Sequence, residues 1–326
     1  MTVHADCVSE LLPRDEARRL IRYATLAPSV HNTQPWRWRI DDDVIELYAD
    51  QDRLLPVEDP LGRNLVISCG AALHHLVLAA ETLGWHADVE RPTGLGAPSL
   101  LARVRLTPTE LPLDSTPLVT MRYRRTDRRR FTSWPIPDQR LEHLARIASE
   151  HGCLAVPLLD NSTRLRMEFL VGTAFAAAAR DREMIEEQGR WVDHSRGDGI
   201  PSQLVPVDSG DALRNRFGAG FLDDRGSELE SSDGVIVLGG VSDDAESWLR
   251  TGEGLSALWR AATEGDLSVV PLSQPIEVEH TRSRLRREVL GGLVTPHLVL
   301  RLGWQAIGRS QLPESPRRPL GDVIDL

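Results

Sequence analysis

Two long segments with helical character set the strongest limit on how this chain folds. Residues 64–84, NLVISCGAALHHLVLAAETLG, have the length and apolar content of a helix buried on most sides, and a glycine ends the segment. Residues 244–264 predict a second helix of similar length that also stops at a glycine, and residues 73–84 align weakly with residues 254–265. Each part of the chain therefore has a central long helix with strands around it, which indicates an internal duplication.

The other periodic segments predict an α+β chain. Helices are expected at 14–26, 138–150, 163–188 and 279–290, and strands at 36–40, 41–50 (after a turn), 85–90, 101–106, 153–158, 234–240, 267–271 and 297–302. The Pro- and Thr-rich stretch 107–119 is a candidate linker, so we expect two halves at 1–118 and 119–326. Residues 193–232 are rich in Gly, Asp and Ser without a sustained period. So long a loop serves as a lid or a binding loop, or is disordered.

The charged residues exclude several kinds of chemistry. The 326 residues carry a net charge of −10, which disfavours a general binder of polyanions. All 38 basic residues are arginine. The absence of lysine excludes a Walker-type phosphate lysine, a lysine Schiff base and a lysine general base. A side-chain cation that holds an anion must therefore be arginine, whose planar fork suits phosphate, or histidine.

Cysteine and histidine spacing gives no sign of a metal site. Cys7, Cys69 and Cys153 are far apart and form no CxxC pair, so we expect free thiols in a reducing cytoplasm. His74 and His75 are adjacent on a helix and point about 100° apart, which favours a core or interface role over shared metal ligation. We expect no signal peptide, and no apolar stretch that reaches the roughly 20 residues needed to span a bilayer.

A turn dense in hydrogen-bonding groups separates the first helix from the first strand. In ATLAPSVHNTQPWRWRI, residues 24–40, Pro28 and Pro35 bracket a serine hydroxyl, an imidazole and two carboxamides. These polar side chains belong to Ser29, His31, Asn32 and Gln34. Because carboxamides both donate and accept hydrogen bonds, the turn suits a heteroaromatic ring rich in amide groups or a polyol chain. The alternative, an Asx-type turn that satisfies its own backbone, stays open.

Arginines gather at two further places. The run MRYRRTDRRRF at 121–131 would offer a phosphate group several bidentate partners. The alternative is a solvated basic helix start capped by Thr126 or Asp127. Nucleic-acid binding is disfavoured, because the chain is acidic and the run has no interleaved aromatics. The tail also carries Arg317 and Arg318 before an apolar end, and it could fold back over the same phosphate.

These segments resemble motifs of the nitroreductase-like FMN proteins. APSVHNTQPWRW resembles their APSxxNxQPWxF turn, and RRTDRRRF resembles their RRSxRxF motif with the Phe one position late. GLSALWRAA resembles their central helix, and PHLVLRLGW with PESPRRPLGDVI resembles their C-terminal strand and tail. In ordinary members the arginine motif precedes the turn. The reversed order here is similar to that of the Acg-type NAD(P)H nitroreductases of actinobacteria, which look like two fused nitroreductase halves.

The resemblance implies a nitroreductase-like fold in which the fused halves form an internal pseudo-dimer, with helices packed around antiparallel or mixed sheets. It implies one FMN at the interface, because the chain has one copy of each motif. Val30 departs from the small polar residue found there in many members. The cofactor-binding residues implied are Pro28, Ser29, Val30, His31, Asn32, Gln34, Arg124, Arg125, Thr126, Arg128, Arg317 and Arg318.

The function implied is hydride transfer from NAD(P)H to the flavin and then to a small-molecule acceptor such as a nitroaromatic or a quinone. Flavin N5 would carry the chemistry, so no side chain is assigned as catalytic, and His31 is the one nearby candidate for an acid. Two alternatives stay open: a flavin-storage protein covered by loop 193–232, and a regulatory scaffold without cofactor. We expect a cytoplasmic monomer that binds neither nucleic acid nor membrane, and pairing into a homodimer stays open.

Overall fold

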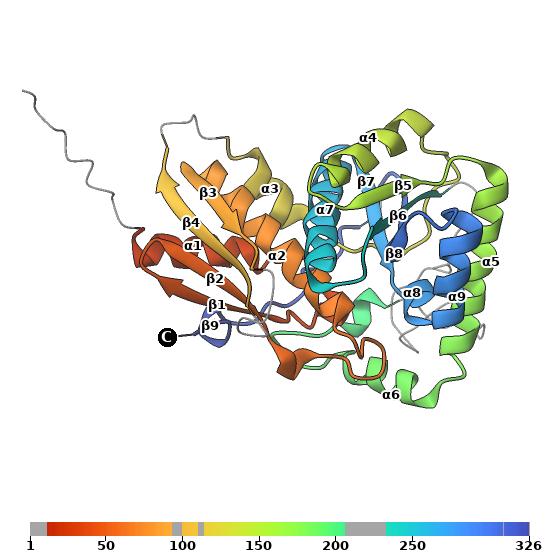
Figure 1. Ribbon diagram of the computed structural model, residues 1–326, viewed down its shortest axis with the longest axis horizontal. Helices are drawn as coiled ribbons and strands as arrows, with labels where there is room; N and C mark the ends of the chain where they lie inside the picture. The colour runs from red at the N-terminus through yellow and green to blue at the C-terminus, as the bar shows by residue number, and fades with distance from the viewer. Residues whose placement is uncertain (1–11, 93–99, 110–113, 206–232, 309, 326) are drawn as a thin grey trace, which may run out of the picture.

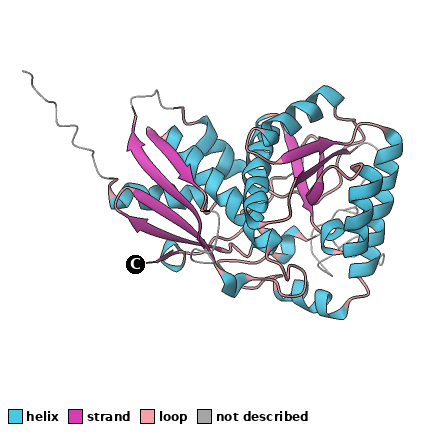
Figure 2. Ribbon diagram, in the orientation of Figure 1, coloured by secondary structure: helices cyan, strands magenta, loops and turns pink. Residues whose placement is uncertain are grey.

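The computed structural model describes residues 12–92, 100–109, 114–205, 233–308 and 310–325. It has the α+β architecture expected from the sequence, with two separate sheets and helices between and around them (Figures 1 and 2). Part of the predicted loop, residues 206–232, and Cys7 lie outside the described residues.

The first sheet is built almost entirely from the N-terminal part of the chain. Its elements are α1 (Arg14–Ala24), β1 (Trp36–Asp41), β2 (Val44–Ala49), α2 (Arg63–Thr82), β3 (Trp85–Glu90), β4 (Leu100–Pro108) and β9 (Ile324–Asp325). The strand order is β3-β4-β2-β1-β9. The predicted hairpin is confirmed, since Trp36 pairs with Ala49 and Asp41 with Val44 in antiparallel register. Strand β9 comes from the tail and adds to β1 in parallel.

The second sheet is antiparallel and has the order β5-β6-β8-β7. Its strands are β5 (Leu154–Pro157), β6 (Gly234–Gly240), β7 (Leu267–Leu272) and β8 (Thr295–Trp304). Its helices are α3 (Thr116–Tyr123), α4 (Asp138–Ser149), α5 (Asn161–Ala178), α6 (Arg182–Arg190), α7 (Ala245–Glu264), α8 (Gln274–Glu277) and α9 (Glu279–Arg284). One buried core runs through both parts, because side chains of α2, β1 and β2 cluster with those of α4, α7 and β8.

Helices α2 and α7 cross at the centre of the molecule, where two glycines let their backbones touch (Figure 1). A Cβ placed on Gly70 would lie 2.1 Å from the carbonyl oxygen of Leu249, and one on Gly252 would lie 2.0 Å from that of Ile67. Ordinary contact needs more than 3.4 Å, so only glycine fits at either position. The two segments that the sequence marks as central helices therefore pack directly against each other.

Three elements differ from the expectations. The helix expected at 163–188 is two helices, because the Asp181 side chain accepts hydrogen bonds from the backbone N–H groups of Glu183 and Met184 and starts α6. The expected linker 107–119 is shorter, since β4 runs to Pro108 and α3 starts at Thr116. The helix expected at 279–290 gives way to a π-helical turn at Leu285–Val289.

The expectation about membrane-length segments was wrong for α2. This helix has 20 residues and a mean hydropathy of 1.4, enough by length and composition to cross a bilayer. However, 83% of its apolar window is buried inside the fold. It is a core helix that packs against α7.

Candidate functional site

The turn after α1 has an unusual backbone. His31, Asn32 and Gln34 have φ angles of 44°, 56° and 50°. Left-handed conformations are uncommon outside glycine, and three within four residues persist only where the surroundings hold them. Two hydroxyls do so in part: the Ser29 Oγ accepts from the Gln34 N–H at 3.0 Å, and the Ser68 Oγ of α2 accepts from the Val30 N–H at 3.1 Å.

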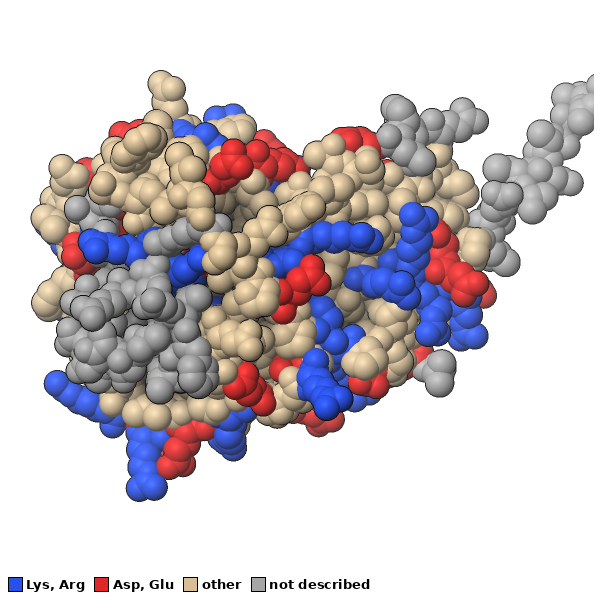
Figure 3. All heavy atoms as spheres, turned by 180° about the vertical axis from the view of Figure 1, so that it is seen from behind, with Lys and Arg blue, Asp and Glu red and all other residues tan. Residues whose placement is uncertain are grey.

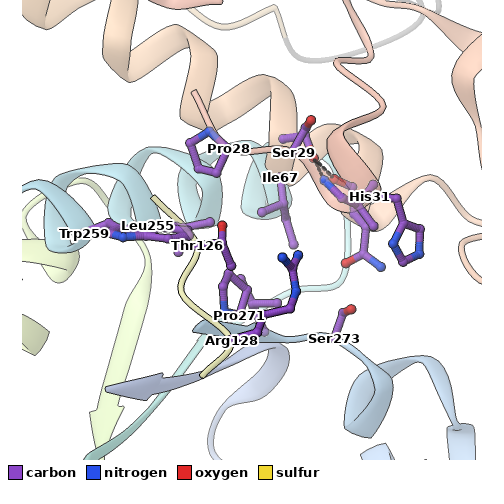
Figure 4. Close-up of a pocket in the computed structure, with 14 residues that line it drawn as sticks. Pro28, Ser29, His31, Ile67, Thr126, Arg128, Leu255, Trp259, Pro271 and Ser273 are labelled. Atoms are coloured by element: carbon purple, nitrogen blue, oxygen red, sulfur yellow. Dashed lines mark hydrogen bonds between the residues drawn. The ribbon is translucent and has the colours of Figure 1, made fainter. Parts of the chain in front are cut away.

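The turn and the arginine run meet across a pocket of about 100 Å³, which we call the inner pocket. Figure 4 shows Thr126 and Arg128 on the side opposite Pro28 and Ser29, with Ile67 of α2 between them. The lining residues are Pro28, Ser29, Val30, His31, Asn64, Ile67, Ser68, Thr126, Arg128, Leu255, Trp259, Pro271, Ser273 and Leu298. Residues almost 100 positions apart in the sequence thus face one another, next to the crossing of α2 and α7.

His31 is held by a buried polar cluster. Its Nε2 contacts a carboxylate oxygen of Glu58, whose other oxygen accepts from the side chain of Gln188 on α6. The neighbouring Glu187 accepts from the backbone N–H groups of Val57 and Glu58. The His31 ring points away from Thr126 and Arg128 in Figure 4. His31 therefore anchors the strained turn to α6, and its ring does not face the middle of the inner pocket.

The two carboxamides of the turn are engaged with other segments of the chain. Asn32 donates from Nδ2 to the carbonyl oxygens of Gly199 and Pro316 at 2.9 and 3.0 Å. Gln34 is fully buried and donates from Nε2 to the carbonyl oxygen of Gly197 at 2.8 Å. Both side chains thus join the turn to the described start of the predicted loop, and neither lines the inner pocket.

The tail arginines bond to the same turn. We call these contacts, which join the turn to Gly197, Gly199 and the tail, the interlock. Arg317 donates from Nη1 to the Asn32 Oδ1 at 3.1 Å and from Nη2 to the Leu26 carbonyl oxygen at 3.0 Å. Arg318 donates its backbone N–H to the Gln34 Oε1 at 2.9 Å and forms an ion pair with Asp50 at 3.3 Å. The tail therefore folds back onto the turn, and burial lowers the pKa of Arg317 to about 10.

A second pocket of about 460 Å³, the arginine pocket, adjoins the first. Its lining residues are Arg19, Arg22, Tyr23, Leu26, Met121, Arg122, Arg124, Arg125, Glu314, Ser315 and Arg317. Arg124 separates the two pockets, because its guanidinium carbon lies 4.6 Å above the ring centre of Trp259, which lines the inner pocket. Arg125 forms an ion pair with Glu314 at 2.7 Å.

Arg124 is buried without full compensation. It is 6% exposed, and its Nη2 makes a long bond of 3.4 Å to the Leu26 carbonyl oxygen. Its Nε and Nη1 have no hydrogen-bond partner among the described residues. Burial and then the neighbouring Arg317 and Arg125 hold its pKa well below the usual range. A buried donor left in this state requires an explanation, and a bound anion is one.

The structure thus distributes the predicted site residues over three places. Those on the inner pocket are Pro28, Ser29, Val30, His31, Thr126 and Arg128. Those on the arginine pocket are Arg124, Arg125 and Arg317. Those in the interlock alone are Asn32, Gln34 and Arg318. The part each plays in binding stays a prediction. No local pattern in the sequence marks Glu58, Gln188 or Ser273, so these residues could not be predicted.

Comparison with known proteins gives the family. No protein-family model matches the chain. The Mycobacterium tuberculosis protein named "Putative NAD(P)H nitroreductase Rv3131" is 35% identical over 318 residues, which cover 95% of this chain and 91% of the relative. The M. tuberculosis protein named "Putative NAD(P)H nitroreductase acg" is 29% identical over 324 residues, or 96% of each chain. The chain belongs to the Acg-type nitroreductase family. The family resemblance seen in the sequence motifs is therefore confirmed.

Solved structures similar to this Acg-type nitroreductase are distant from it. One is a nitroreductase with bound FMN from Desulfitobacterium hafniense, with a TM-score of 0.42 and 13% identity over 66% of this chain and 99% of that one. Another is the FMN-dependent nitroreductase NfnB from Mycobacterium smegmatis in complex with NADPH. It has a TM-score of 0.42 and 14% identity over 65% of this chain and 98% of that one.

Proposed function

We propose that this chain is an FMN-dependent oxidoreductase that passes a hydride from NAD(P)H to a nitroaromatic or quinone acceptor. The observation that carries the proposal is the buried Arg124, which lies where the two pockets adjoin. Its Nε and Nη1 have no hydrogen-bond partner among the described residues. The family assignment supports FMN as the source of that anion.

The residues present fit this cofactor. A phosphate group accepts several charge-assisted hydrogen bonds, and Arg124 and Arg317 together offer three guanidinium nitrogens without partners among the described residues. The inner pocket offers apolar walls from Ile67 and Leu255 and polar groups from Thr126 and Arg128. In this arrangement Arg124 and Arg317 hold the phosphate, and the inner pocket holds the ring system.

Bound FMN would supply the two-electron redox centre. The chain's own residues bind and orient it. Arg128 contributes a positive charge to the inner pocket, which stabilises negative charge that develops on a bound ring. Trp259 and Leu255 form apolar walls of the same pocket and exclude water from it.

The alternative is a flavin-storage protein with no turnover, and the interlock favours it. The chain from Gly197 to Gly199 and the tail at Arg317 are both bonded to the turn. Contacts of this kind limit access for a hydride donor. Anaerobic addition of NADH or NADPH to the yellow protein separates the two: bleaching supports the enzyme, and colour that only dithionite removes supports storage.

We also infer that the chain works in the cytoplasm as a monomer whose two halves, 1–118 and 119–326, replace the two subunits of a dimer. The crossing of α2 and α7 and the shared core support this inference. The partners are then small molecules, the electron donor and the acceptor, and neither nucleic acid nor membrane.

The cofactor assignment is tested by Arg124→Gln, with the exposed Arg146→Gln on α4 as control. We expect the first variant to keep its circular dichroism spectrum and bind FMN at least tenfold more weakly, about 1.4 kcal/mol. The control should match the wild type. FMN bound by Arg124→Gln at wild-type affinity would show that the phosphate lies elsewhere.

A further inference from the structure

The arginine pocket carries more positive charge than one phosphate requires. Of its six guanidinium groups, that of Arg125 is paired with Glu314 at 2.7 Å and that of Arg19 with Glu16 at 3.3 Å. The other four belong to Arg22, Arg122, Arg124 and Arg317. A phosphate monoester carries about two negative charges at most. About two positive charges therefore remain at a pocket in a chain whose net charge is −10.

These charges lie at two levels. Arg124 is buried at the base of the pocket, beside Trp259. Arg22 of α1 and Arg122 of α3 are exposed and line the same pocket from two different helices. The back of the molecule shows a band of basic side chains across its middle (Figure 3). The outer level of the pocket is thus open to a ligand that the base does not hold.

Arg122 is also held in a position where it can contact a planar group of a ligand. Its guanidinium carbon lies 5.5 Å from the ring centre of Tyr23, and its Nη2 donates to the Tyr23 hydroxyl at 3.4 Å. Because both faces of a guanidinium are flat, an arginine held beside Tyr23 in this way can stack on a second planar group. A phosphate beside a purine ring matches this combination of groups.

We propose that Arg22 and Arg122 form a second phosphate subsite, which binds the 2′-phosphate end of NADPH and makes the chain prefer NADPH to NADH. This proposal rests on the proposed function, since it names the hydride donor of that same site. NADPH and NADH differ by one phosphate monoester on the adenosine ribose. Two exposed guanidinium groups without acidic partners among the described residues are suited to detect that group.

The test uses the FMN-loaded protein and two adenosine probes, 2′,5′-ADP and 5′-AMP, titrated by calorimetry. We expect 2′,5′-ADP to bind about tenfold more tightly, with the difference shrinking as salt rises from 50 to 500 mM. The double variant R22Q/R122Q should lose the difference. The control Arg14→Gln, an exposed arginine in the first turn of the same α1 helix, should keep it.

Each outcome decides one of the two proposals. Equal binding of the two probes to the wild type, or an unchanged difference in R22Q/R122Q, overturns the second phosphate subsite. FMN content is measured by absorbance in every preparation. Arg22 and Arg122 are not assigned to the cofactor, so R22Q/R122Q should keep its FMN. A wild-type chain that takes up no FMN refutes the proposed function, and titration of that chain with the two probes still decides whether the outer subsite exists.

Discussion

Replacing Gly252 by alanine tests the central crossing of α2 and α7. The added methyl group would lie 2.0 Å from the Ile67 carbonyl oxygen, about 1.4 Å closer than the 3.4 Å at which ordinary contact begins. The obstacle is helix backbone, which cannot rotate away as a side chain can. The two helices must therefore separate along part of their length.

The magnitude follows from two opposing effects. Overpacking of a tight core costs about 3 kcal/mol or more, and alanine in place of glycine inside a helix returns about 1 kcal/mol. We expect Gly252→Ala to lower the free energy of unfolding by about 2 kcal/mol or more. FMN content should fall too, since Ile67 lines the inner pocket.

The assay is urea unfolding followed by circular dichroism, with Gly172→Ala as the matched control. Gly172 lies within α5, and a Cβ placed there meets nothing within 4 Å. The control should gain up to about 1 kcal/mol from helix propensity alone. If Gly252→Ala proved as stable as Gly172→Ala, the helices would not be in backbone contact and the described crossing would be wrong.

Three further changes test single contacts. Burial raises the pKa of Asp59 to about 6 from 3.8. Between about pH 4 and 6 the folded chain therefore holds a proton that the unfolded chain releases, so the free energy of unfolding falls as the pH rises through this range. Asp59→Asn should remove this fall of about 3 kcal/mol, measured as urea midpoints across that range. Glu58→Gln deprives His31 and Gln188 of the shared carboxylate and should cost about 2 kcal/mol. The exposed Glu168→Gln, by contrast, should stay within about 0.5 kcal/mol in the same assay. Gln34→Leu leaves the Arg318 N–H without its acceptor, so trypsin should cleave the tail faster than in the wild type; an equal rate would contradict the interlock.

The helices with a strong period were predictable to within two residues. The segment expected at 64–84 is α2 at Arg63–Thr82, and the segment expected at 244–264 is α7 at Ala245–Glu264. Both keep a helical period over about five turns and end where a glycine follows within two residues, so local information was sufficient. The division of 163–188 was missed because Asp181 interrupts an otherwise continuous pattern through a single capping side chain.

The site was predictable in its motifs and less so in its contacts. The sequence indicated that the turn and the arginine run belong to one site, and Ser29 and Thr126 do line one pocket. It could not show where Asn32 and Gln34 point, because their left-handed backbone turns the side chains toward the tail and Gly197. Glu58 was not foreseeable either, since its partner Gln188 lies 130 residues away.

The contacts of the C-terminal residues with the first turn and the first sheet affect how this protein folds during translation. Arg317 holds the first turn, and Ile324 pairs with Trp38 at the edge of the first sheet. Each contact joins residues that lie about 285 positions apart, so neither can form until residues 317–325 have left the ribosome. A nascent chain that still lacks these residues therefore cannot close the tail over the turn.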